Sequence, residues 1–442
     1  LGLTYRYSVE HELSIKEFKK LVIIDENNID GLDHLGYSYE LNKNIKEAIE
    51  CYNQSKLVEN KDEKDNYADI RLAHCYYLKN DLEHAELLIN KEKITKNETS
   101  SSYAIRGTIL RDKKEYDKAI LNIEKVITIN PESRREWYQL AWCHGEKGNH
   151  ELALEYYKKN LQIHDNFDES GSYAIGYELE KLDRKKEARD WYNQELLKYP
   201  ENTQMLTALA FLSREFGDHD ESIKNWDKIS EITPNNQWIP FRKSADLINQ
   251  NKLEESLECV EKILTADKQE DSPSKAILMN QKGWILYKMK KYEESMEWIE
   301  KSLSIEPKLA NTIDSKAEVL FTQEKYDEAE KAYQELFEIE KSDIAEQGIA
   351  DCKRCRGNQI KNDDELKKKY YEEAIKIYDS ILKKNKTDDY AWYSKGLCYW
   401  NLEKYEDSRN CQLEAVRIDP KDITYWNELG DIAKITNKHD QA

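Results

Sequence analysis

An internal repeat of about 34 residues constrains this 442-residue chain more than any other feature. Prolines first reveal the period, because Pro131, Pro200 and Pro234 are separated by 69 and 34 residues. Pro307 follows Pro234 by 73 residues, which is two periods and a short excess around the sequence DSPSK. In the same register, a small residue is followed twelve positions later by Ala or Ser. The pairs are Gly2/Ser14, Gly36/Ala48, Ala73/Ala85, Gly107/Ala119, Ala141/Ala153, Gly176/Ala188, Ala210/Ser222, Ser244/Ser256, Gly283/Ser295, Ala317/Ala329, Gly396/Ser408 and Gly430/Ala442.

The paired small residues predict antiparallel helical hairpins. Two helices approach closely only if each offers a small side chain where they cross, and bulky neighbours fill the remaining space. Such bulky residues flank each pair, as in WYQLAWCHGEKGNHELALEYY from Trp137 to Tyr157. Composition agrees, because 35% charged residues with only 14 Gly and 7 Pro favour helix, while 29 Tyr and 10 Trp argue against disorder. A single hairpin cannot bury its apolar face alone, so the hairpins should stack into a solenoid.

The repeat resembles the tetratricopeptide repeat, whose signature is W-x2-L-G-x2-Y, then A-x3-F, then P. The resemblance extends over about eleven full repeats and two partial ones. It implies an all-α fold, a right-handed α-solenoid of about thirteen helical hairpins, two of them partial. The motif encodes packing and therefore says little about chemistry. Matching residues include Trp137, Leu140 and Ala141; Trp426, Leu429 and Gly430; Leu35, Gly36 and Tyr39; and, in second helices, Ala48 with Tyr52, Ala153 with Tyr157, Ala188 with Tyr192, and Ala329 with Tyr333.

The register predicts a single continuous array over residues 1–442. An insertion, QIKNDDELKKKY, has no Gly or Pro and is expected to lengthen both helices of its hairpin; a docking role and a tolerated, solvated insertion both remain open. Leu1 takes the seventh motif position and Ala442 lies inside a second helix, so neither end carries a polar capping repeat. We therefore interpret the sequence as part of a longer protein. The predicted segments are a partial first repeat (1–28), regular repeats (29–342), a repeat (343–388) with inserted residues 359–370, a regular repeat (389–422) and a partial last repeat (423–442).

The sequence contains no recognisable motif for catalysis, a cofactor or a metal ion. Its one C-x-x-C, from Cys352 to Cys355, has no second pair and no nearby His at metal-ligand spacing. The G-x-S-x-G, Walker and Rossmann glycine patterns are absent from the sequence. Cysteines recur instead at two packing positions of the repeat, which favours buried thiols in a reducing compartment. The tenth position holds Cys75, Cys143, Cys352 and Cys398, and the twenty-third holds Cys51, Cys259 and Cys411.

The net charge of −19 limits the classes of partner. Binding to nucleic acid phosphates requires a basic face, so a nucleic acid partner is not expected. A basic protein partner is compatible with this charge, as is a surface that is merely acidic and solvated. The apolar stretches, such as MLTALAFL, are too short to span a bilayer, so no membrane association is expected. With reduced thiols, these features predict a cytoplasmic protein.

The ninth motif position is the main candidate for a partner-binding site. In the tetratricopeptide family it points into the concave groove, and here it reads Tyr37, His74, Thr108, Trp142, Tyr177, Phe211, Ala245 and Trp284. Aromatic residues with Arg are typical of binding hot spots. Co-chaperones of the family bind C-terminal carboxylates through Lys and Asn at positions five and nine, and sugar-transferase relatives use Asn at position six; neither pattern occurs here. The predicted partner-binding residues are Tyr37, Tyr138, Trp142, Tyr173, Tyr177, Phe211, Arg214, Trp238, Phe241, Arg242, Trp284 and Tyr287.

Two functions of different classes follow from this groove. The leading hypothesis is a non-catalytic scaffold that binds a peptide, a helix or a protein along its concave face. The alternative is a ligand-sensing or regulatory arm of a larger enzyme, such as an ATPase, protease or nuclease, whose catalytic domain lies outside these residues. A missing domain of the same chain is a further candidate occupant of the groove. Trp142, Tyr177, Phe211 and Trp284 should project into this groove and contribute little to the core, so their replacement by Ala should leave stability nearly unchanged.

Overall fold

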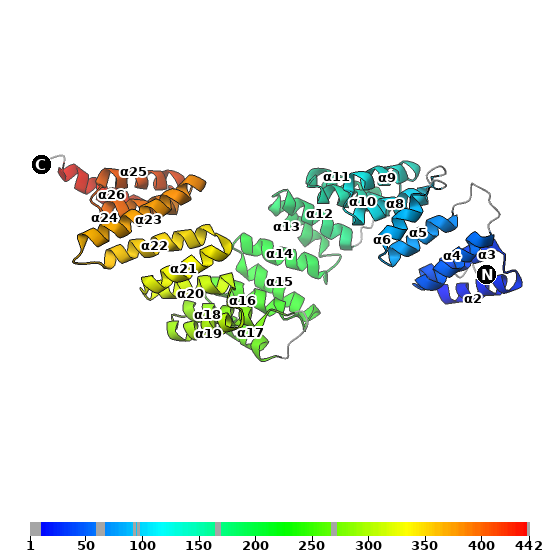
Figure 1. Ribbon diagram of the computed structural model, residues 1–442, viewed down its shortest axis with the longest axis horizontal. Coiled ribbons are helices and arrows are strands. Elements are labelled where there is room, and N and C mark those ends of the chain that lie inside the picture. The colour runs from blue at the N-terminus through cyan, green and yellow to red at the C-terminus, as the bar shows by residue number, and fades with distance from the viewer. Residues whose placement is uncertain are drawn as a thin grey trace. The chain divides into compact units, whose positions relative to one another are not determined.

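The computed structural model describes residues 10–58, 67–91, 94, 98–163, 169–266 and 272–439. These residues form 24 α-helices and no strand, which confirms the predicted all-helical solenoid (Figure 1). The outermost repeat markers, Leu1, Gly2 and Ala442, lie outside the described residues. By its internal contacts the chain divides into two compact units, Leu1–Met205 (unit 1) and Leu206–Ala442 (unit 2). Within each unit, helices that are consecutive in the sequence pack against one another.

In the described part of unit 1, a single helix precedes a series of hairpins. The helix α14 (Thr203–Glu215) begins at the end of this unit and continues into unit 2. The single helix is α2 (His11–Ile24), and the hairpins are α3 (Ile29–Leu41) with α4 (Ile45–Val58), α5 (Tyr67–Leu78) with α6 (Leu82–Ile89), α8 (Ser100–Asp112) with α9 (Tyr116–Ile129), α10 (Arg134–Glu146) with α11 (His150–Ile163), and α12 (Glu169–Lys181) with α13 (Lys185–Glu195).

Unit 2 continues the same alternation of helices. In it, α14 pairs with α15 (His219–Ile232), and the last described helix is α26 (Ile423–His439). The hairpins between them are α16 (Trp238–Asn249) with α17 (Leu253–Thr265), α18 (Lys275–Lys288) with α19 (Tyr292–Ile305), α20 (Ala310–Thr322) with α21 (Tyr326–Glu340), α22 (Asp343–Gln359) with α23 (Asp364–Lys384), and α24 (Asp389–Asn401) with α25 (Tyr405–Ile418).

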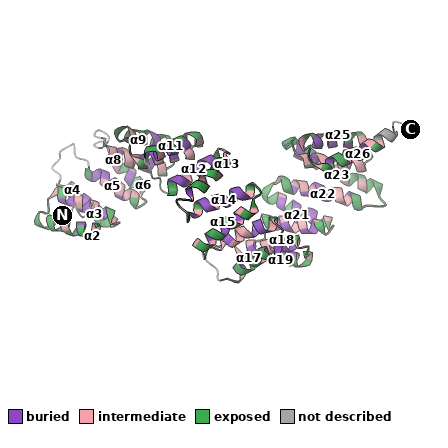
Figure 2. Ribbon diagram, turned by 180° about the vertical axis from the view of Figure 1, so that it is seen from behind, coloured by how far each residue is buried: buried purple, intermediate pink, exposed green. Residues whose placement is uncertain are grey.

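The paired small residues lie where the two helices of each hairpin cross. Alanines and serines of these pairs are fully buried, and Figure 2 shows buried residues along the helix faces that meet other helices. Serine replaces alanine in several second helices because its hydroxyl donates a hydrogen bond to the backbone carbonyl of the partner twelve residues earlier. These bonds run from Ser256 Oγ to Ser244 O (2.9 Å), from Ser295 Oγ to Gly283 O (2.7 Å) and from Ser408 Oγ to Gly396 O (2.9 Å).

A left-handed residue closes the turn of each regular hairpin. In the first described hairpin, Lys43 has φ +64, its N–H donates to Glu40 O, and the N–H of Asn44 donates to Tyr39 O. These are the two hydrogen bonds of a Schellman motif, which ends an α-helix. The same pair of bonds and a positive φ recur at Asn80, Lys114, Gly148, Asp183, Gly217, Asn251, Lys290, Glu324 and Glu403.

The hairpin that carries the insertion lacks this turn. No described residue between α22 and α23 has a positive φ, and these helices are 17 and 21 residues long, against 12 to 15 for the other helices from α15 to α25. The extension is anchored on the neighbouring hairpin, because the Arg356 guanidinium lies 4.4 Å from the ring centre of Tyr370 and contacts Glu330 at 2.9 Å. The docking and solvated-insertion alternatives for residues 359–370 are not separated by this contact.

A buried carboxylate joins three helices of unit 2. Asp246 on α16 is 0% exposed and accepts hydrogen bonds from Arg214 on α14 (2.7 Å to each oxygen) and from Ser222 (2.8 Å) and Trp226 (3.0 Å) on α15. His219 Nδ1 lies 3.1 Å from the same carboxylate. Burial alone would raise the pKa of Asp246, but the hydrogen bonds from Arg214, His219 and Ser222 outweigh it and keep this pKa below its ordinary value.

Replacing Gly176 with Leu should destabilise the fold. A Cβ at this position would lie 2.2 Å from Cε1 of Tyr192, which is fully buried on the facing helix α13. Overpacking of this kind costs about 3 kcal/mol of unfolding free energy. Gly430 is a matched control, because it holds the same motif position in α26, and no described atom lies within 4 Å of a Cβ built there. We expect Gly430→Leu to leave urea unfolding unchanged or to raise stability by up to about 1 kcal/mol through helix propensity. Equal losses from both substitutions would contradict the crossing argument.

Replacing Asp246 with Asn should lower the free energy of unfolding by about 3 kcal/mol at neutral pH. Because the pKa of Asp246 is lowered in the folded chain, its contribution is present above the ordinary carboxyl pKa and is lost as pH falls through its own pKa. The difference between wild type and variant, measured by urea unfolding across pH, should therefore shrink only in strong acid. Asp227→Asn, which removes a half-exposed carboxylate paired with Lys243, should cost less than about 1 kcal/mol.

Candidate partner-binding groove

Most of the cysteines are buried thiols. All eight are free, and six are buried: Cys51, Cys75, Cys143, Cys352, Cys398 and Cys411. Burial raises the pKa of Cys75 and of Cys398 to about 12, so these thiols are protonated and unreactive at neutral pH. In the described ranges, no group of three or more His, Cys, Asp or Glu side chains is placed to hold a metal ion. The prediction of core thiols is therefore confirmed for these six residues.

None of the described helices combines the length and the apolar character that crossing a bilayer requires.

The predicted partner-binding residues all remain accessible to solvent in part. Tyr177 and Phe211 are the most exposed ninth-position aromatics, at 40% and 41%, and the others are half-buried. Two of the predicted residues also support the core, because Trp142 packs on the cluster around Leu140 and Phe241 packs on the cluster around Ile285. The expectation that the ninth-position aromatics contribute little to the core is therefore wrong for Trp142. It applies best to Tyr177 and Phe211.

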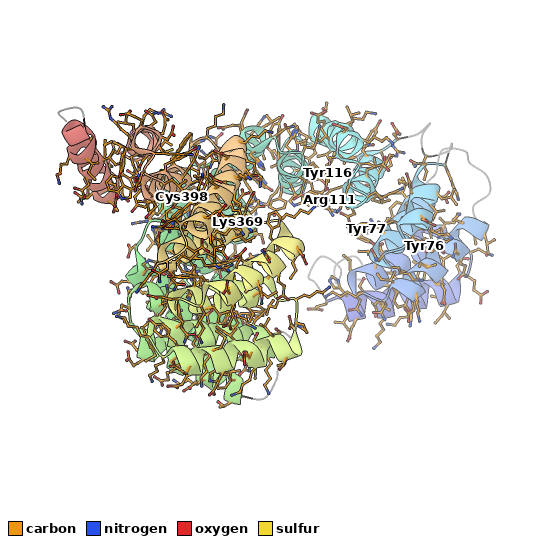
Figure 3. All side chains as sticks on the ribbon, turned by 60° about the vertical axis from the view of Figure 1, so that its left-hand side comes forward. Tyr76, Tyr77, Arg111, Tyr116, Lys369 and Cys398 are labelled. Carbon is orange, nitrogen blue, oxygen red and sulfur yellow. The ribbon has the colours of Figure 1, made fainter. Side chains whose placement is uncertain are left out.

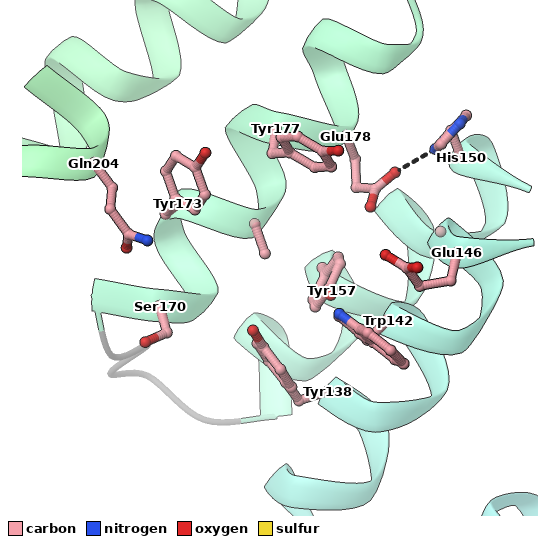
Figure 4. A pocket seen from close by; sticks show the side chains of 12 residues that line it. Tyr138, Trp142, Glu146, His150, Tyr157, Ser170, Tyr173, Tyr177, Glu178 and Gln204 are labelled. Atoms are coloured by element: carbon pink, nitrogen blue, oxygen red, sulfur yellow. Dashed lines mark hydrogen bonds and ion pairs between the residues drawn. The ribbon is translucent and has the colours of Figure 1, made fainter. Parts of the chain in front are cut away.

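Four predicted residues line one cavity in unit 1 (Figure 4). Its volume is about 370 Å³, and it lies between the first helices α10 and α12. Tyr138 and Trp142 come from α10, one helical turn apart, and Tyr173 and Tyr177 come from α12 with the same spacing. Tyr157 of α11 forms part of the wall, with its ring centre 5.3 Å from that of Tyr138 in an edge-to-face arrangement. The repeat register therefore brings these aromatic side chains to one hollow.

Two carboxylates at the rim give this cavity an acidic side. Glu178 on α12 is only 4% exposed and its carboxylate lies 2.8 Å from His150 Nδ1. Burial raises the pKa of Glu178, although the hydrogen bond from His150 opposes the rise. Gly145 allows this approach, because a Cβ there would lie 2.5 Å from a Glu178 oxygen. Glu146 is exposed, and Tyr116 donates a long hydrogen bond of 3.4 Å to it.

The aromatic surface of unit 1 continues from this cavity toward earlier helices. Figure 3 shows Tyr77, Arg111 and Tyr116 near one another. Arg111 on α8 donates to the Tyr77 hydroxyl at 3.3 Å and lies 5.5 Å from the ring centre of Trp142. Tyr116 meets Trp142 edge to face, with ring centres 5.9 Å apart. One guanidinium therefore connects the aromatic residues of three neighbouring hairpins.

The predicted residues of unit 2 form three smaller groups. Phe211 lies under two guanidinium groups, with Arg214 at 5.5 Å and Arg242 at 5.1 Å from its ring centre. Trp238 and Phe241 form an edge-to-face pair on α16 with ring centres 5.7 Å apart. The third group, on α18, pairs Trp284 with Tyr287 at 5.0 Å, and the Tyr287 hydroxyl is 3.0 Å from that of Thr322 on α20.

It was not predicted from the sequence that a Lys or Arg side chain lies over the ring of each ninth-position aromatic residue. The charged group lies about as close as a favourable cation–π contact requires. Two of these contacts join residues four apart on one helix, so their spacing could have been recognised in the sequence; the contacts of Tyr37 and Trp142 come from other helices and could not. The contacts are Arg71 with Tyr37 (4.6 Å), Arg111 with Trp142 (5.5 Å), Lys181 with Tyr177 (5.0 Å), Arg242 with Phe211 (5.1 Å) and Lys288 with Trp284 (4.4 Å).

Two curated proteins and one solved structure show how this chain resembles known proteins. "TPR repeat-containing protein MJ1428" of Methanocaldococcus jannaschii is 22% identical over 306 residues, which cover 67% of this chain and 54% of that protein. "Hsp70-Hsp90 organizing protein 3" of Arabidopsis thaliana is 25% identical over 240 residues, 53% of this chain and 39% of that protein. The chain thus spans about half or less of the length of these relatives. A crystal structure of the "APC/C hetero-tetramer Cut9-Hcn1" covers 98% of this chain and 95% of its own, at 12% identity and a TM-score of 0.44.

The family assignment rests on the repeats themselves. The sequence model described as "Tetratricopeptide repeat" matches residues 29–62, 100–133, 137–163, 276–309 and 389–422. Four of these segments begin and end where the small-residue register places whole repeats, and the fifth lies inside one. Between and around them, the described helices continue as hairpins, and all but the hairpin of α22 and α23 keep the same turn. The chain therefore contains tetratricopeptide repeats in these five segments.

Proposed function

We propose that this chain is a non-catalytic interaction scaffold that binds a peptide, a helix or a segment of another protein along the groove formed by its first helices. The observation that carries the proposal is the cavity lined by Tyr138, Trp142, Tyr173 and Tyr177. Its volume of about 370 Å³ suits a bulky side chain of a partner. Aromatic side chains that are held in place but still accessible are what interface hot spots use.

The geometry of the cavity supports recognition of a partner side chain. Tyr138 is braced by the buried Tyr157, and Trp142 is braced by Tyr116, so neither ring must be ordered when a partner binds. Preorganised rings lose little conformational entropy on association, which favours affinity. Glu146 and Glu178 at the rim could accept hydrogen bonds from polar groups of the same partner.

The relatives support the same class of function. One is named an Hsp70–Hsp90 organizing protein, which describes a role toward other proteins. Solenoids of this family present extended concave surfaces for such contacts. No feature of the described residues favours the alternative of a regulatory arm over the scaffold, and both would use the same groove.

Replacing Tyr177 with Ala should weaken partner binding by about 2 kcal/mol while leaving thermal unfolding nearly unchanged. Tyr177 is suited to this test because it lines the cavity and is 40% exposed, so its removal takes little from the core. The partner would be recovered by pull-down of the intact protein and mass spectrometry, and its affinity for each variant measured by calorimetry.

Ile129→Ala is the matched control for Tyr177→Ala. Ile129 is 58% exposed at the end of the second helix α9, so it removes apolar surface away from the cavity. Its affinity and its melting temperature should both equal those of wild type. A partner that binds the Tyr177 variant with wild-type affinity would exclude the cavity as its site.

A further inference from the structure

The repeat allows one position to be compared in two places along the chain. Arg71 on α5 and Arg242 on α16 both hold the sixth motif position. Each guanidinium lies over the aromatic ninth residue of the preceding hairpin: Arg71 is 4.6 Å from the ring centre of Tyr37, and Arg242 is 5.1 Å from that of Phe211. The two arginines therefore have equivalent surroundings on one side.

In unit 1, the charge of Arg71 is neutralised within the chain. Its partner is Glu40, which holds the twelfth position of the preceding first helix, α3, and receives a hydrogen bond of 3.1 Å from Arg71 Nε. The Glu40 side chain is only 4% exposed, so this carboxylate fills the space beside the guanidinium. Arg71 and Glu40 thus show how a sixth-position arginine is satisfied in this chain.

In unit 2, the equivalent twelfth position is occupied by a second cation. Arg214 stands where Glu40 stands in unit 1, and its own guanidinium is bound to the buried Asp246. Within the described chain, no carboxylate lies within ion-pair distance of Arg242, and its guanidinium donates no hydrogen bond. Burial, followed by the nearby charge of Arg214, lowers the pKa of Arg242. The guanidinium of Arg242 packs on the rings of Phe211 and Trp226, at 5.1 and 5.7 Å from their centres, but no anion of the described chain neutralises it. A carboxylate from a partner would therefore stabilise this half-buried charge.

Other half-buried arginines contact a carboxylate, whereas Arg242 does not. Despite the net charge of −19, Arg242 is half-buried without a carboxylate while exposed carboxylates abound elsewhere. Half-buried arginines that contact a carboxylate are Arg71, Arg106, Arg111, Arg184, Arg214, Arg354 and Arg356.

We propose that Arg242 binds a carboxylate of an acidic peptide segment, at the place that Glu40 takes beside Arg71. This assignment rests on the proposed groove function and gives it a partner chemistry in unit 2. Guanidinium and carboxylate form strong, charge-assisted hydrogen bonds, and Trp238 on the same helix offers an apolar surface to the neighbouring peptide residue. The local chemistry thus favours an acidic ligand, whereas the net charge of the whole chain is compatible with a basic one.

The acidic part of such a ligand would be confined to the Arg242 end of the unit 2 groove. Farther along the unit, α20 carries Asp314 and Glu318 at the fifth and ninth motif positions. Burial raises the pKa of both carboxyl groups, and the charge of Asp314 raises that of Glu318 further. A carboxylate of the ligand would be repelled at α20. Acidic residues of the ligand are therefore expected beside Arg242 and not beside α20.

The test is selection of short random peptides displayed on phage against the full chain and its Arg242→Gln variant. We expect wild type to enrich peptides with Asp or Glu next to an aromatic residue. The best selected peptide, labelled with fluorescein, should bind the Arg242→Gln variant about tenfold more weakly than wild type by fluorescence anisotropy. Lys243→Gln is the control, since this neighbour loses the same charge but points to Asp227 of α15 at 2.5 Å. It should retain both the enrichment and the affinity.

Each outcome decides between the two proposals. Enrichment of aromatic peptides without Asp or Glu, or with Lys and Arg, would overturn the carboxylate assignment and leave the groove function standing. Enrichment of no sequence by any form of the chain would overturn both. Amidating the C-terminus of the selected peptide distinguishes the source of the carboxylate, because only a C-terminal carboxylate would be lost. Equal binding of Arg242→Gln and wild type to the acidic peptide would also refute the assignment.

Discussion

Close crossing of two helices at a pair of small residues is the constraint on which this structure depends. Gly176 and Ala188 mark such a crossing, and the buried Tyr192 lies against the bare backbone of Gly176. Where the second residue is Ser, its hydroxyl binds the carbonyl of the facing helix, so the crossing gains a hydrogen bond without gaining width. Once that separation is fixed, the distance between first helices of successive hairpins follows, and so does the spacing of the side chains that they present.

The groove residues are side chains of the first helices that are not used in the helix crossings. First helices bury their eighth and tenth positions, as Ala141 and Cys143 show, and leave the ninth between them accessible at most repeats, as Trp142 shows; Thr108 is a buried exception. Side chains at that position are free to vary without moving a helix crossing. In this chain they are aromatic at several repeats and each described ring is paired with a cation from the same or another helix. The proposed binding surface therefore follows from the register of the core, in agreement with the way repeat families carry many functions on one fold.

Most of the fold could be predicted from the sequence because its determinants are local and periodic. The twelve-residue spacing between Ser244 and Ser256 indicates a hairpin whatever lies elsewhere in the chain. The cavity of unit 1 was predictable to the same degree, since Tyr138 and Tyr177 follow from the register. The lack of a carboxylate partner for Arg242 could not be predicted, because it depends on Asp246 binding Arg214 and not Arg242. Ion pairs among three helices follow no regular spacing in the sequence, so the repeat pattern does not predict them.

The Schellman turns have a consequence for how such a chain can change length. Each turn makes its two backbone hydrogen bonds within the same hairpin. In the first described hairpin, the N–H groups of Lys43 and Asn44 donate to the carbonyls of Glu40 and Tyr39. Duplication or removal of one whole repeat would therefore leave the turn within every remaining hairpin unchanged. Where the chain did grow by a fraction of a repeat, between α22 and α23, that turn was replaced and Asp363 caps the second helix instead. Insertion of whole repeats keeps the Schellman turn between the helices, whereas insertion of part of a repeat requires a different turn.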